Sequence, residues 1–293
     1  MGLKAFIDYL EIEKKYSSNT IVSYNNYLTS FKNFILKEFD LKLLEDSNYT
    51  NVRSWIIYLV DSGNSNKSIN RKISSLNSFF KFCLKTGIIK DNPLKNHRSL
   101  KTEKKIQLPF SENEMFDVLN KDNFDNTFEG IRDRLIIELF YSTGIRRIEL
   151  VDLKISDIDF SNNQIKVLGK RNKERIIPLI NSSKELILNY LKSRNAVNSE
   201  NDYLFITKKG KLIYEKLVYR IINKYFNNIS TKVKKSPHII RHSFATHLLN
   251  NGADLNSVKE LLGHSSLAAT QVYTNRSIEE IKKVFAKSHP RNK

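Results

Sequence analysis

At 293 residues, 40% hydrophobic and 11% aromatic, the chain is long enough for two domains with cores of their own. Its 49 Lys and Arg residues against 31 Asp and Glu residues give a formal net charge of +18, which favours a polyanionic partner, nucleic acid before a membrane surface. No signal peptide, lipidation signal or bilayer-spanning run is found, and the single cysteine, Cys83, excludes an intrachain disulfide or a zinc knuckle, so we expect a cytoplasmic protein with Cys83 in its core.

The first part of the chain, residues 3–87, is predicted to consist of helices. Apolar residues recur with the 3.6-residue helical period in three segments, of which the first has Ser17 or Ser18 as its cap and the others cover residues 51–62 and 66–87. The positions predicted to be buried are Ile21, Tyr24, Leu28, Phe31, Ile35, Val52, Trp55, Ile56, Leu59, Ile69, Ile73, Leu76, Phe80 and Leu84. This pattern predicts a small helical bundle.

A basic segment without apolar periodicity, residues 93–109, separates a first domain at 1–92 from a second domain at 110–293. It contains two prolines and a run of cations, namely Lys95, Arg98, Lys101, Lys104 and Lys105. A charge run of this kind is most often a solvated linker. Because this one joins two domains of a strongly basic chain, contact with phosphate groups is at least as favoured.

The second domain is predicted to mix helices with short strands. A capping box of Ser111 and Glu114 begins its first helix, and a later helix ends at Gly144. Short strands are expected at residues 165–168 and 176–179, as a β-hairpin, and at 202–205. From about residue 213 the pattern is helical. The fold class is therefore mainly α with a small β-hairpin or sheet, in two domains.

The stretch PHIIRHSFATHLLNNG holds three histidines and an arginine on one predicted helix. A zinc protease would need a glutamate directly after the first histidine, where Ile239 stands, and no cysteine or carboxylate cluster completes a structural zinc site. His238 and Arg241 are three residues apart, so they share a helix face and can address one phosphate group. An equal alternative is that His238, His242 and His247 are ordinary hydrogen-bonded histidines of a surface helix.

The stretch YSTGIRRIELVDL places two arginines directly after a tight bend at Gly144. The helix that follows is predicted to bury Ile148, Leu150, Val151 and Leu153. Arg146 and Arg147 then lie in its first turn, where a guanidinium held in one orientation can grip two phosphate oxygens. For this stretch alone, a surface ion pair with Glu149 is the favoured alternative, and Glu149 is also expected to help hold the turn.

Two more stretches carry candidate functional residues. GKRNKER places four cations at the tip of the predicted hairpin, namely Lys170, Arg171, Lys173 and Arg175. A hairpin tip can enter a groove of DNA, although a basic hairpin by itself is usually only solvated. In LLGHSSLAATQVYT, His264 precedes Tyr273 by nine residues, and such a tyrosine taken alone is more often core than nucleophile.

Taken in order, these stretches resemble the catalytic domain of the tyrosine site-specific recombinases, the integrase superfamily. The matching positions are Arg146 in TGIRRIEL, Lys170 in GKRNKER, His238 and Arg241 in HIIRHSFATHLL, His264 in LLGHSS and Tyr273 in QVYT. The helical first domain resembles the core-binding domain of that family, and the compact length is most similar to its Xer branch. Arg171 stands where a glycine is common, which affects the turn but leaves Lys170 in place.

The resemblance implies that DNA strands are cleaved and rejoined without ATP, metal or cofactor. Tyr273 would form a 3′-phosphotyrosyl bond and free a 5′-hydroxyl group, so that the bond energy is kept. Arg146 and Arg241 would stabilise the negative charge that gathers on the nonbridging oxygens, and His264 would donate a further hydrogen bond to them.

Proton transfer is assigned by the same resemblance. His238 is the candidate general base for the tyrosine hydroxyl, and Lys170 would protonate the departing 5′-oxygen. Further contacts with double-stranded DNA are expected from Lys95, Arg98, Lys101, Lys104, Lys105, Arg147, Arg171, Lys173 and Arg175.

After the tyrosine, an apolar stripe is formed by Ile278, Ile281, Val284 and Phe285. Such a stripe can pack on its own domain, but the resemblance implies exchange with a neighbouring protomer, which we expect here. The implied assembly is a homotetramer, or a heterotetramer with a second recombinase, on two duplexes, acting through a Holliday junction with a DNA translocase as a candidate activator. Resolution of chromosome dimers at cell division is the expected role; the alternatives are an integrase of a mobile element or phage, a type IB topoisomerase and a non-catalytic DNA-binding protein.

Overall fold

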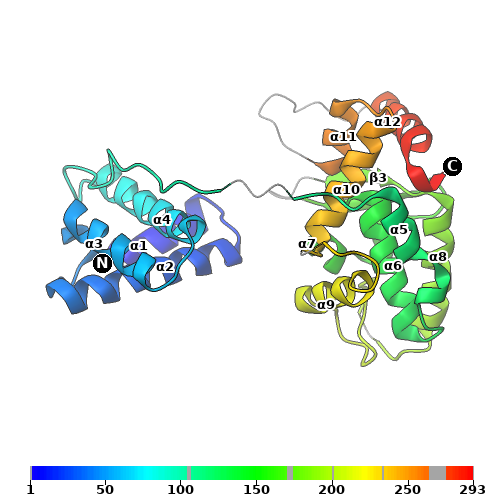
Figure 1. Ribbon diagram of the computed structural model, residues 1–293, viewed down its shortest axis with the longest axis horizontal. Helices are drawn as coiled ribbons and strands as arrows, with labels where there is room; N and C mark the ends of the chain where they lie inside the picture. Colours follow the sequence, from blue (N-terminus) through cyan, green and yellow to red (C-terminus); the bar gives the residue numbers. More distant parts are fainter. Residues whose placement is uncertain are drawn as a thin grey trace. The chain divides into compact units, whose positions relative to one another are not determined.

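The computed structural model describes residues 2–103, 107–169, 174–199, 201–232, 234–263 and 275–292, with the backbone alone at 275–281. The chain forms two compact units, Met1–Lys105 and Ile106–Lys293, each with a hydrophobic core of its own (Figure 1). In the part of the chain so described, no helix is both long and apolar enough to cross a bilayer. The predicted fold class, mainly helical with a small sheet, is confirmed.

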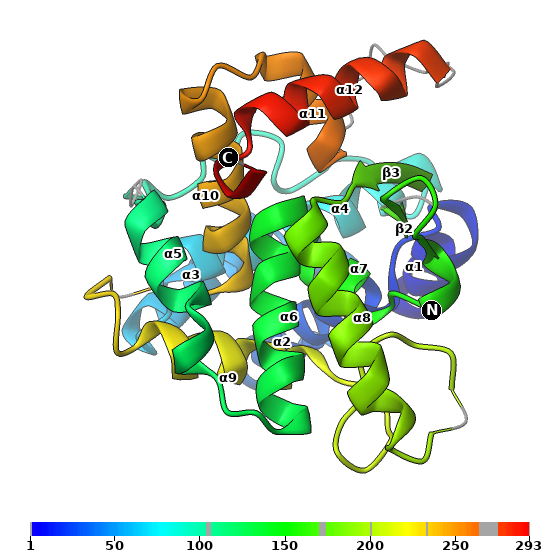
Figure 2. The same ribbon diagram turned by 90° about the vertical axis from the view of Figure 1, so that its right-hand side faces the viewer.

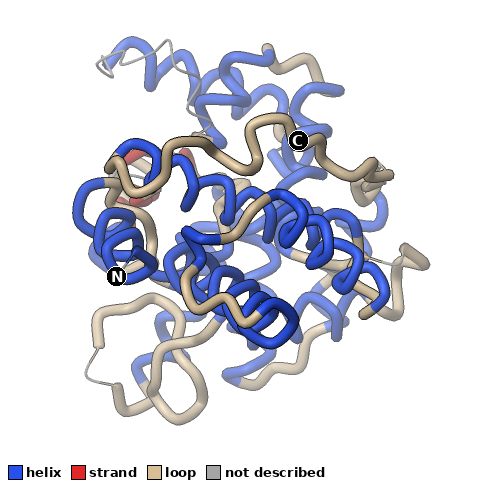
Figure 3. Tube along the Cα trace, turned by 90° about the vertical axis from the view of Figure 1, so that its left-hand side faces the viewer, coloured by secondary structure: helices blue, strands red, loops and turns tan. Residues whose placement is uncertain are grey.

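The first unit consists of helices joined by loops (Figure 3). Its elements are α1 (Gly2–Asp8), a π-helical turn (Tyr9–Glu13), α2 (Ser18–Phe39), a 3-10 turn (Leu44–Asp46), α3 (Tyr49–Asp61) and α4 (Asn66–Lys85). The side chain of Asn48 caps α3 by accepting hydrogen bonds from the backbone N–H groups of Thr50 and Asn51. Ser17 is the residue that precedes α2, as one of the two predicted caps, but its side chain makes no capping hydrogen bond.

The core of the first unit is aromatic. Phe31 of α2 and Trp55 of α3 lie with their ring centroids 4.8 Å apart, and Phe79 of α4 meets Phe6 of α1 edge-on at 5.5 Å. All four side chains are fully buried. The amphipathic stripes predicted from the sequence therefore meet in one core between α1, α2, α3 and α4.

Near the end of α4 the buried stripe differs from the prediction by one position. Cys83 is fully buried, as predicted, and this desolvation raises the pKa of its thiol to about 11. The prediction that Leu84 is buried is wrong, because its side chain is 43% exposed. Phe79, Phe80 and Cys83 complete the inner face, so Leu84 is rotated away from it.

Much of the predicted linker packs on α4 and so belongs to the first unit. The amide side chain of Asn70 donates to the carbonyl of Leu100 at 2.8 Å and accepts from the N–H of the same residue at 2.9 Å. Asn66 donates to the carbonyl of Lys101 at 2.8 Å, and Leu94 is buried in the core. These contacts attach residues 93 to 101 of the predicted linker to the first unit.

The second unit surrounds a buried helix, α6. Its elements are α5 (Glu112–Leu119), α6 (Phe128–Thr143), α7 (Arg147–Val151), β1 (Ile158–Asp159), β2 (Gln164–Leu168), β3 (Glu174–Pro178), α8 (Asn181–Asn195), α9 (Glu215–Phe226), α10 (Pro237–Asn250), α11 (Leu255–Leu262) and α12 (Asn275–Ser288), with 3-10 turns at Lys121–Asn123, Ile155–Asp157 and Pro290–Asn292. The predicted capping box at the start of α5 is confirmed, with Ser111 and Glu114 bonded to each other's backbone N–H groups. Helix α6 is buried along most of its length and packs between α8 and α10 (Figure 2).

The predicted β-hairpin is present and gains a third short strand. The sheet is antiparallel in the order β1-β2-β3, with Ile165 opposite Ile177 and Val167 opposite Arg175. The predicted strand at 202–205 is wrong, since only a single bridge joins Tyr203 to Lys154. The side chain of Arg194 donates to the carbonyl of Tyr203 at 2.9 Å and occupies an acceptor that a strand ladder would use.

The last helix packs on its own domain at its C-terminal end. Phe285 is 2% exposed, with its ring 5.1 Å from His289 and 6.4 Å from Phe244 of α10, and Val284 is half-buried against the same core. At these two positions the stripe packs on its own domain in this structure, which is the alternative named above. Exchange with a neighbouring protomer stays a prediction. Ile278 and Ile281 lie outside the described side chains.

Candidate active site

The turn after α6 determines where Arg146 lies. Gly144 has a φ of +58°, and a Cβ atom there would lie 2.5 Å from a ring carbon of Phe244, so the turn requires glycine on two grounds. Three residues separate the end of α6 at Thr143 from the start of α7 at Arg147. Arg146 is thereby placed directly before α7, a helix whose buried residues are Glu149, Leu150 and Val151. Ile148 is an exception to the predicted pattern, because it is 47% exposed on the outer side of this short helix.

Glu149 of α7 is the carboxylate that holds this turn. It is buried, and it accepts from the backbone N–H of Arg146 at 2.8 Å and from the Nη1 of the same residue at 2.6 Å. Arg175 of β3 binds the two carboxylate oxygens through its two Nη atoms, each at 2.8 Å. Although burial alone would raise it, these hydrogen bonds from Arg175 and Arg146 lower the pKa of Glu149 to about 2.

Arg241 reaches the same place from α10. Its Nη1 donates to the carbonyl of Gly144, and its Nη2 donates to the carbonyl of Leu262 at 2.5 Å. Its side chain is buried. Burial first, and then the charges of Arg146 and Arg175, lower the pKa of Arg241 to about 9, which leaves it charged at neutral pH.

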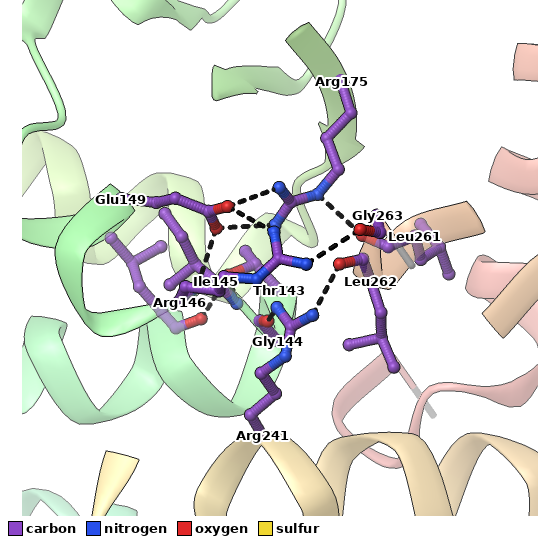
Figure 4. A network of polar contacts seen from close by, with 11 residues as sticks. Thr143, Gly144, Ile145, Arg146, Glu149, Arg175, Arg241, Leu261, Leu262 and Gly263 are labelled. Carbon is purple, nitrogen blue, oxygen red and sulfur yellow. Dashed lines mark hydrogen bonds and ion pairs between the residues drawn. The ribbon is translucent and has the colours of Figure 1, made fainter. Parts of the chain in front are cut away.

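The C-terminal end of α11 gathers all three arginines (Figure 4). Arg175 donates to the carbonyl of Leu261 at 3.0 Å through Nε, Arg241 to that of Leu262, and Arg146 to that of Gly263 at 2.8 Å. The last carbonyls of a helix have no partner within the helix and carry the negative end of its dipole, so guanidinium groups are suitable partners for them. Three consecutive carbonyls thus align three cations.

This cluster carries more positive than negative charge. Three guanidinium groups, from Arg146, Arg175 and Arg241, face one carboxylate, from Glu149. When buried cations outnumber the buried anions beside them, the excess positive charge is poorly solvated and attracts a further anion strongly. Arg146 is the most accessible of the three, with 31% of its side chain exposed. The arrangement is suited to hold a phosphate group.

The histidines of α10 separate into two kinds. His238 and His242 are exposed, and His238 lies in the first turn of the helix, three residues before Arg241. His247 is buried, and its Nδ1 shares a hydrogen bond of 2.8 Å with the Tyr141 hydroxyl; burial lowers the pKa of His247. The interpretation as an ordinary hydrogen-bonded histidine therefore holds for His247.

Several predicted site residues lie outside the described residues: Lys170, His264 and Tyr273 of the catalytic set, and Lys104, Lys105, Arg171 and Lys173 of the DNA contacts. Their roles remain predictions. Of the remaining DNA contacts, Lys95, Arg98 and Lys101 have exposed side chains on the first unit.

Arg175 corrects a prediction. It was expected on the hairpin tip in contact with DNA, but it lies within β3 and only 4% of its side chain is exposed. Its guanidinium is occupied by Glu149 and by the carbonyl of Leu261. As the second residue of β3, next to the exposed Glu174, Arg175 has its side chain on the inward face of the strand, as Ile177 does. The charge pattern of GKRNKER alone does not reveal this.

A basic and aromatic hollow of about 540 Å³ lies beside Arg147, at the start of α9. Its lining consists of Arg147, Tyr214, Glu215, Lys216, Tyr219 and Arg220. Arg147 forms an ion pair with Glu215, and Arg220 lies over the ring of Tyr214 with its Cζ 5.7 Å from the centroid. The α9 residues were not among the predicted DNA contacts, although the mixture of aromatic and basic residues in YEKLVYR is a signal for nucleic-acid contact.

Comparison with known proteins places the chain in a family. The second unit matches the family described as "Phage integrase family" over residues 110–280, and the first matches "Phage integrase, N-terminal SAM-like domain" over residues 3–87. The protein named tyrosine recombinase XerC of Anoxybacillus flavithermus is 39% identical over 297 residues, with 99% of this chain and 97% of the relative covered. That of Staphylococcus aureus strain MSSA476 is 38% identical over 292 residues, with 99% and 97% covered.

Solved structures agree in fold. A XerH site-specific recombinase bound to a palindromic difH substrate has a TM-score of 0.73 at 23% identity, with 99% of this chain and 81% of that chain covered. The Tn1549 transposon integrase in complex with transposon right end DNA has a TM-score of 0.74 at 18% identity, with 97% and 99% covered. At these identities the likeness concerns the fold. With the matches over nearly the full length of the curated relatives, the chain belongs to the phage integrase family, as a tyrosine recombinase of the Xer-like branch.

Proposed function

We propose that this protein resolves chromosome dimers by site-specific recombination between two DNA duplexes. The observation that carries the proposal is the alignment of Arg146 and Arg241 on consecutive carbonyls of α11, in a cluster with an excess of positive charge. The relatives named XerC support the recombinase class over nearly the whole chain. An integrase of a mobile element is the second candidate, because the Tn1549 transposon integrase has a similar fold. It ranks second because that likeness concerns the fold alone.

In the proposed reaction, the scissile phosphate lies against Arg146 and Arg241. Attack by the Tyr273 hydroxyl on phosphorus forms the 3′-phosphotyrosyl bond and breaks the bond to the 5′-oxygen, which leaves as a hydroxyl group. As the pentavalent transition state forms, charge grows on the nonbridging oxygens, and the two guanidinium groups stabilise it because they are already oriented. By analogy with removal of one oxyanion donor, loss of either arginine slows cleavage roughly a hundred- to a thousandfold.

Two protons move in this step. His238, exposed at the start of α10, takes the proton of the tyrosine hydroxyl, and Lys170 gives one to the 5′-oxygen. The carbonyl of Gly263 accepts a hydrogen bond from Arg146, and His264 is the next residue in the sequence. We assign to His264 a hydrogen bond to a nonbridging oxygen. The reverse reaction with a 5′-hydroxyl from another strand completes the exchange, and no ATP is consumed.

DNA binding outside the cleavage site is assigned to two surfaces. The cations Lys95, Arg98 and Lys101 belong to the first unit, and the hollow beside Arg147 belongs to the second. We further propose a tetramer of this chain, alone or with a second recombinase, on two duplexes in the cytoplasm, with a DNA translocase as activator. Subunit contact by α12 then requires its C-terminal part to leave the position that Phe285 occupies in this structure.

The test is a covalent trapping assay. A nicked DNA duplex drawn from a candidate recombination site of the host loses a short fragment on cleavage, so that the phosphotyrosyl product accumulates. We expect a protein–DNA band on a denaturing gel that resists EDTA and is absent with Tyr273→Phe. The assay is repeated on several sites and with a second recombinase and a translocase supplied. If DNA binding is tight and salt-sensitive but no such band forms under any of these conditions, the result favours the non-catalytic DNA-binding alternative.

A further inference from the structure

Arg175 is the most completely engaged arginine of the site, yet none of the roles proposed above uses it. Its two Nη atoms bind Glu149 at 2.8 Å each, and its Nε binds the carbonyl of Leu261 at 3.0 Å. Its side chain is 4% exposed and packs so closely on Gly263 that a Cβ atom there would lie 3.0 Å from its Cδ. A guanidinium enclosed in this way does not reach a phosphate; it fixes the groups around it.

The first group that it fixes is Arg146, through a shared carboxylate. Glu149 Oε1 accepts from the Nη1 atoms of both arginines, at 2.6 Å from Arg146 and 2.8 Å from Arg175. Because Arg175 occupies both oxygens, Arg146 holds the carboxylate through one side-chain nitrogen, and its other Nη binds Gly263. Without Arg175, both oxygens become available for a bidentate pair with Arg146, which would rotate that guanidinium and neutralise more of its charge.

The second group is Arg241, through the end of α11. Arg175 ties the carbonyl of Leu261 to β3 and α7, and the next carbonyl, of Leu262, accepts from Arg241. Since the carbonyls of one helical turn move together, a shift at Leu261 is transmitted to the acceptors of Arg241 and Arg146. Arg175 is thus connected to Arg146 through a shared carboxylate and to Arg241 through two consecutive backbone carbonyls.

We propose that Arg175 is a positioning residue of the recombination reaction, which orients Arg146 and Arg241 toward the scissile phosphate without touching DNA. This inference rests on the proposed strand cleavage. It assigns a function to a buried arginine within GKRNKER, a stretch whose basic residues were expected to contact DNA on the basis of their charge. The alternative is that the pair with Glu149 serves stability alone.

The test compares Arg175→Lys with a matched control in the same unit. Lysine keeps the charge but has no planar fork to bind both oxygens of Glu149. Arg132→Lys is the control, because Arg132 is also a buried arginine that binds a carboxylate, that of Asp133 at 2.7 Å, and a carbonyl, that of Ile206 at 3.4 Å. The rate constant of single-turnover cleavage, rather than the yield, is measured on the nicked duplex, so that a partly inactive preparation does not affect it.

A second substrate separates positioning from stability. It carries a methylphosphonate at the scissile position, where a methyl group replaces one nonbridging oxygen and the transition state bears one negative charge fewer. If Arg175 orients the arginines that stabilise this charge, Arg175→Lys slows cleavage of the normal phosphate about ten- to a hundredfold, as a small misplacement of catalytic groups does. The defect then becomes much smaller on the methylphosphonate, while the Kd for DNA does not change.

The outcomes are distinguishable. For Arg132→Lys we expect the same ratio to wild type on both substrates. A wild-type rate for Arg175→Lys, or an equal defect on both substrates, overturns the inference and leaves the proposed function intact. Absence of any Tyr273-dependent product from the wild-type protein overturns both. Should Arg175→Lys fail to fold by circular dichroism, Arg175→Gln carries the same comparison, since its amide retains one hydrogen bond to Glu149.

Discussion

Arg175 and Glu149 form a buried bidentate ion pair between β3 and α7, with each of two Nη atoms 2.8 Å from a carboxylate oxygen. The same carboxylate holds the side chain and the backbone N–H of Arg146. One glutamate therefore connects the hairpin to the turn that carries Arg146, the arginine for which we propose binding of the scissile phosphate. Arg175 is held entirely by protein groups, namely Glu149 and the carbonyl of Leu261.

Glu149→Gln is expected to weaken both stability and cleavage. The amide keeps the shape of the side chain but removes the negative charge and directs an N–H group toward a guanidinium. Breaking a buried ion pair costs about 3–5 kcal/mol, and loss of the hold on Arg146 slows cleavage about a hundredfold. Urea unfolding and single-turnover cleavage measure the two effects. Glu185→Gln, at an exposed position of α8, is the control; equal behaviour of the two variants would contradict this prediction.

Phe285→Ala is expected to release the C-terminal end of α12 from its own domain. The ring is 2% exposed and lies among Phe244 and His289, so its removal costs about 3 kcal/mol. Hydrogen exchange of the backbone amides at 282–289 should then accelerate by up to about a hundredfold. Lys283→Ala, at an exposed position of the same helix, should leave this exchange unchanged. Slow exchange in Phe285→Ala would show that other contacts hold the segment.

The second unit is expected to lose stability in mild acid because of His289. Burial lowers the pKa of this fully buried imidazole from 6.5 to about 4; its ring accepts the backbone N–H of Arg291 at Nδ1, and the charges of Arg291 and His247 oppose protonation further. Between these two pH values the unfolded chain binds a proton that the folded chain does not, so the free energy of unfolding falls as the pH falls from 6.5 to 4. The full contribution is ~3 kcal/mol.

Urea unfolding at pH 7.5 and at pH 5, followed by circular dichroism, measures this loss. His289→Phe keeps an aromatic ring among Tyr141, Phe244 and Phe285 but cannot be protonated. It should therefore show a smaller difference between the two pH values than the wild-type protein. An unchanged difference would assign the acid sensitivity to another group, such as the buried His247.

Substitution of the hollow beside Arg147 is expected to change the salt dependence of DNA binding. Lys216 and Arg220 are exposed there, and each that contacts a phosphate contributes about 0.9 to the slope of log affinity against log salt. Lys216→Ala and Arg220→Ala should each reduce the slope by about that amount. Lys192→Ala, an exposed cation of α8 outside the hollow, is the control. The prediction is wrong if all three variants have the wild-type slope.

Sequence alone determined what depends on local pattern. The helical period predicted the bundle of α2, α3 and α4, since an amphipathic stripe has one favourable face to bury. The capping box at Ser111 and the end of α6 at Gly144 followed from side-chain chemistry that acts within four residues. The motif order identified the family, which the comparisons then confirmed.

Only the tertiary structure decided which charges are surface and which are buried. Arg175, Lys95 and Arg98 look alike in the sequence, but Arg175 is enclosed because β3 turns it toward Glu149, 26 residues earlier in the chain. The alignment of Arg146, Arg175 and Arg241 depends on carbonyls of α11 that lie 21 to 117 residues away in sequence. Such long-range hydrogen bonds have no local signature, because their partners are chosen by the packing of whole elements.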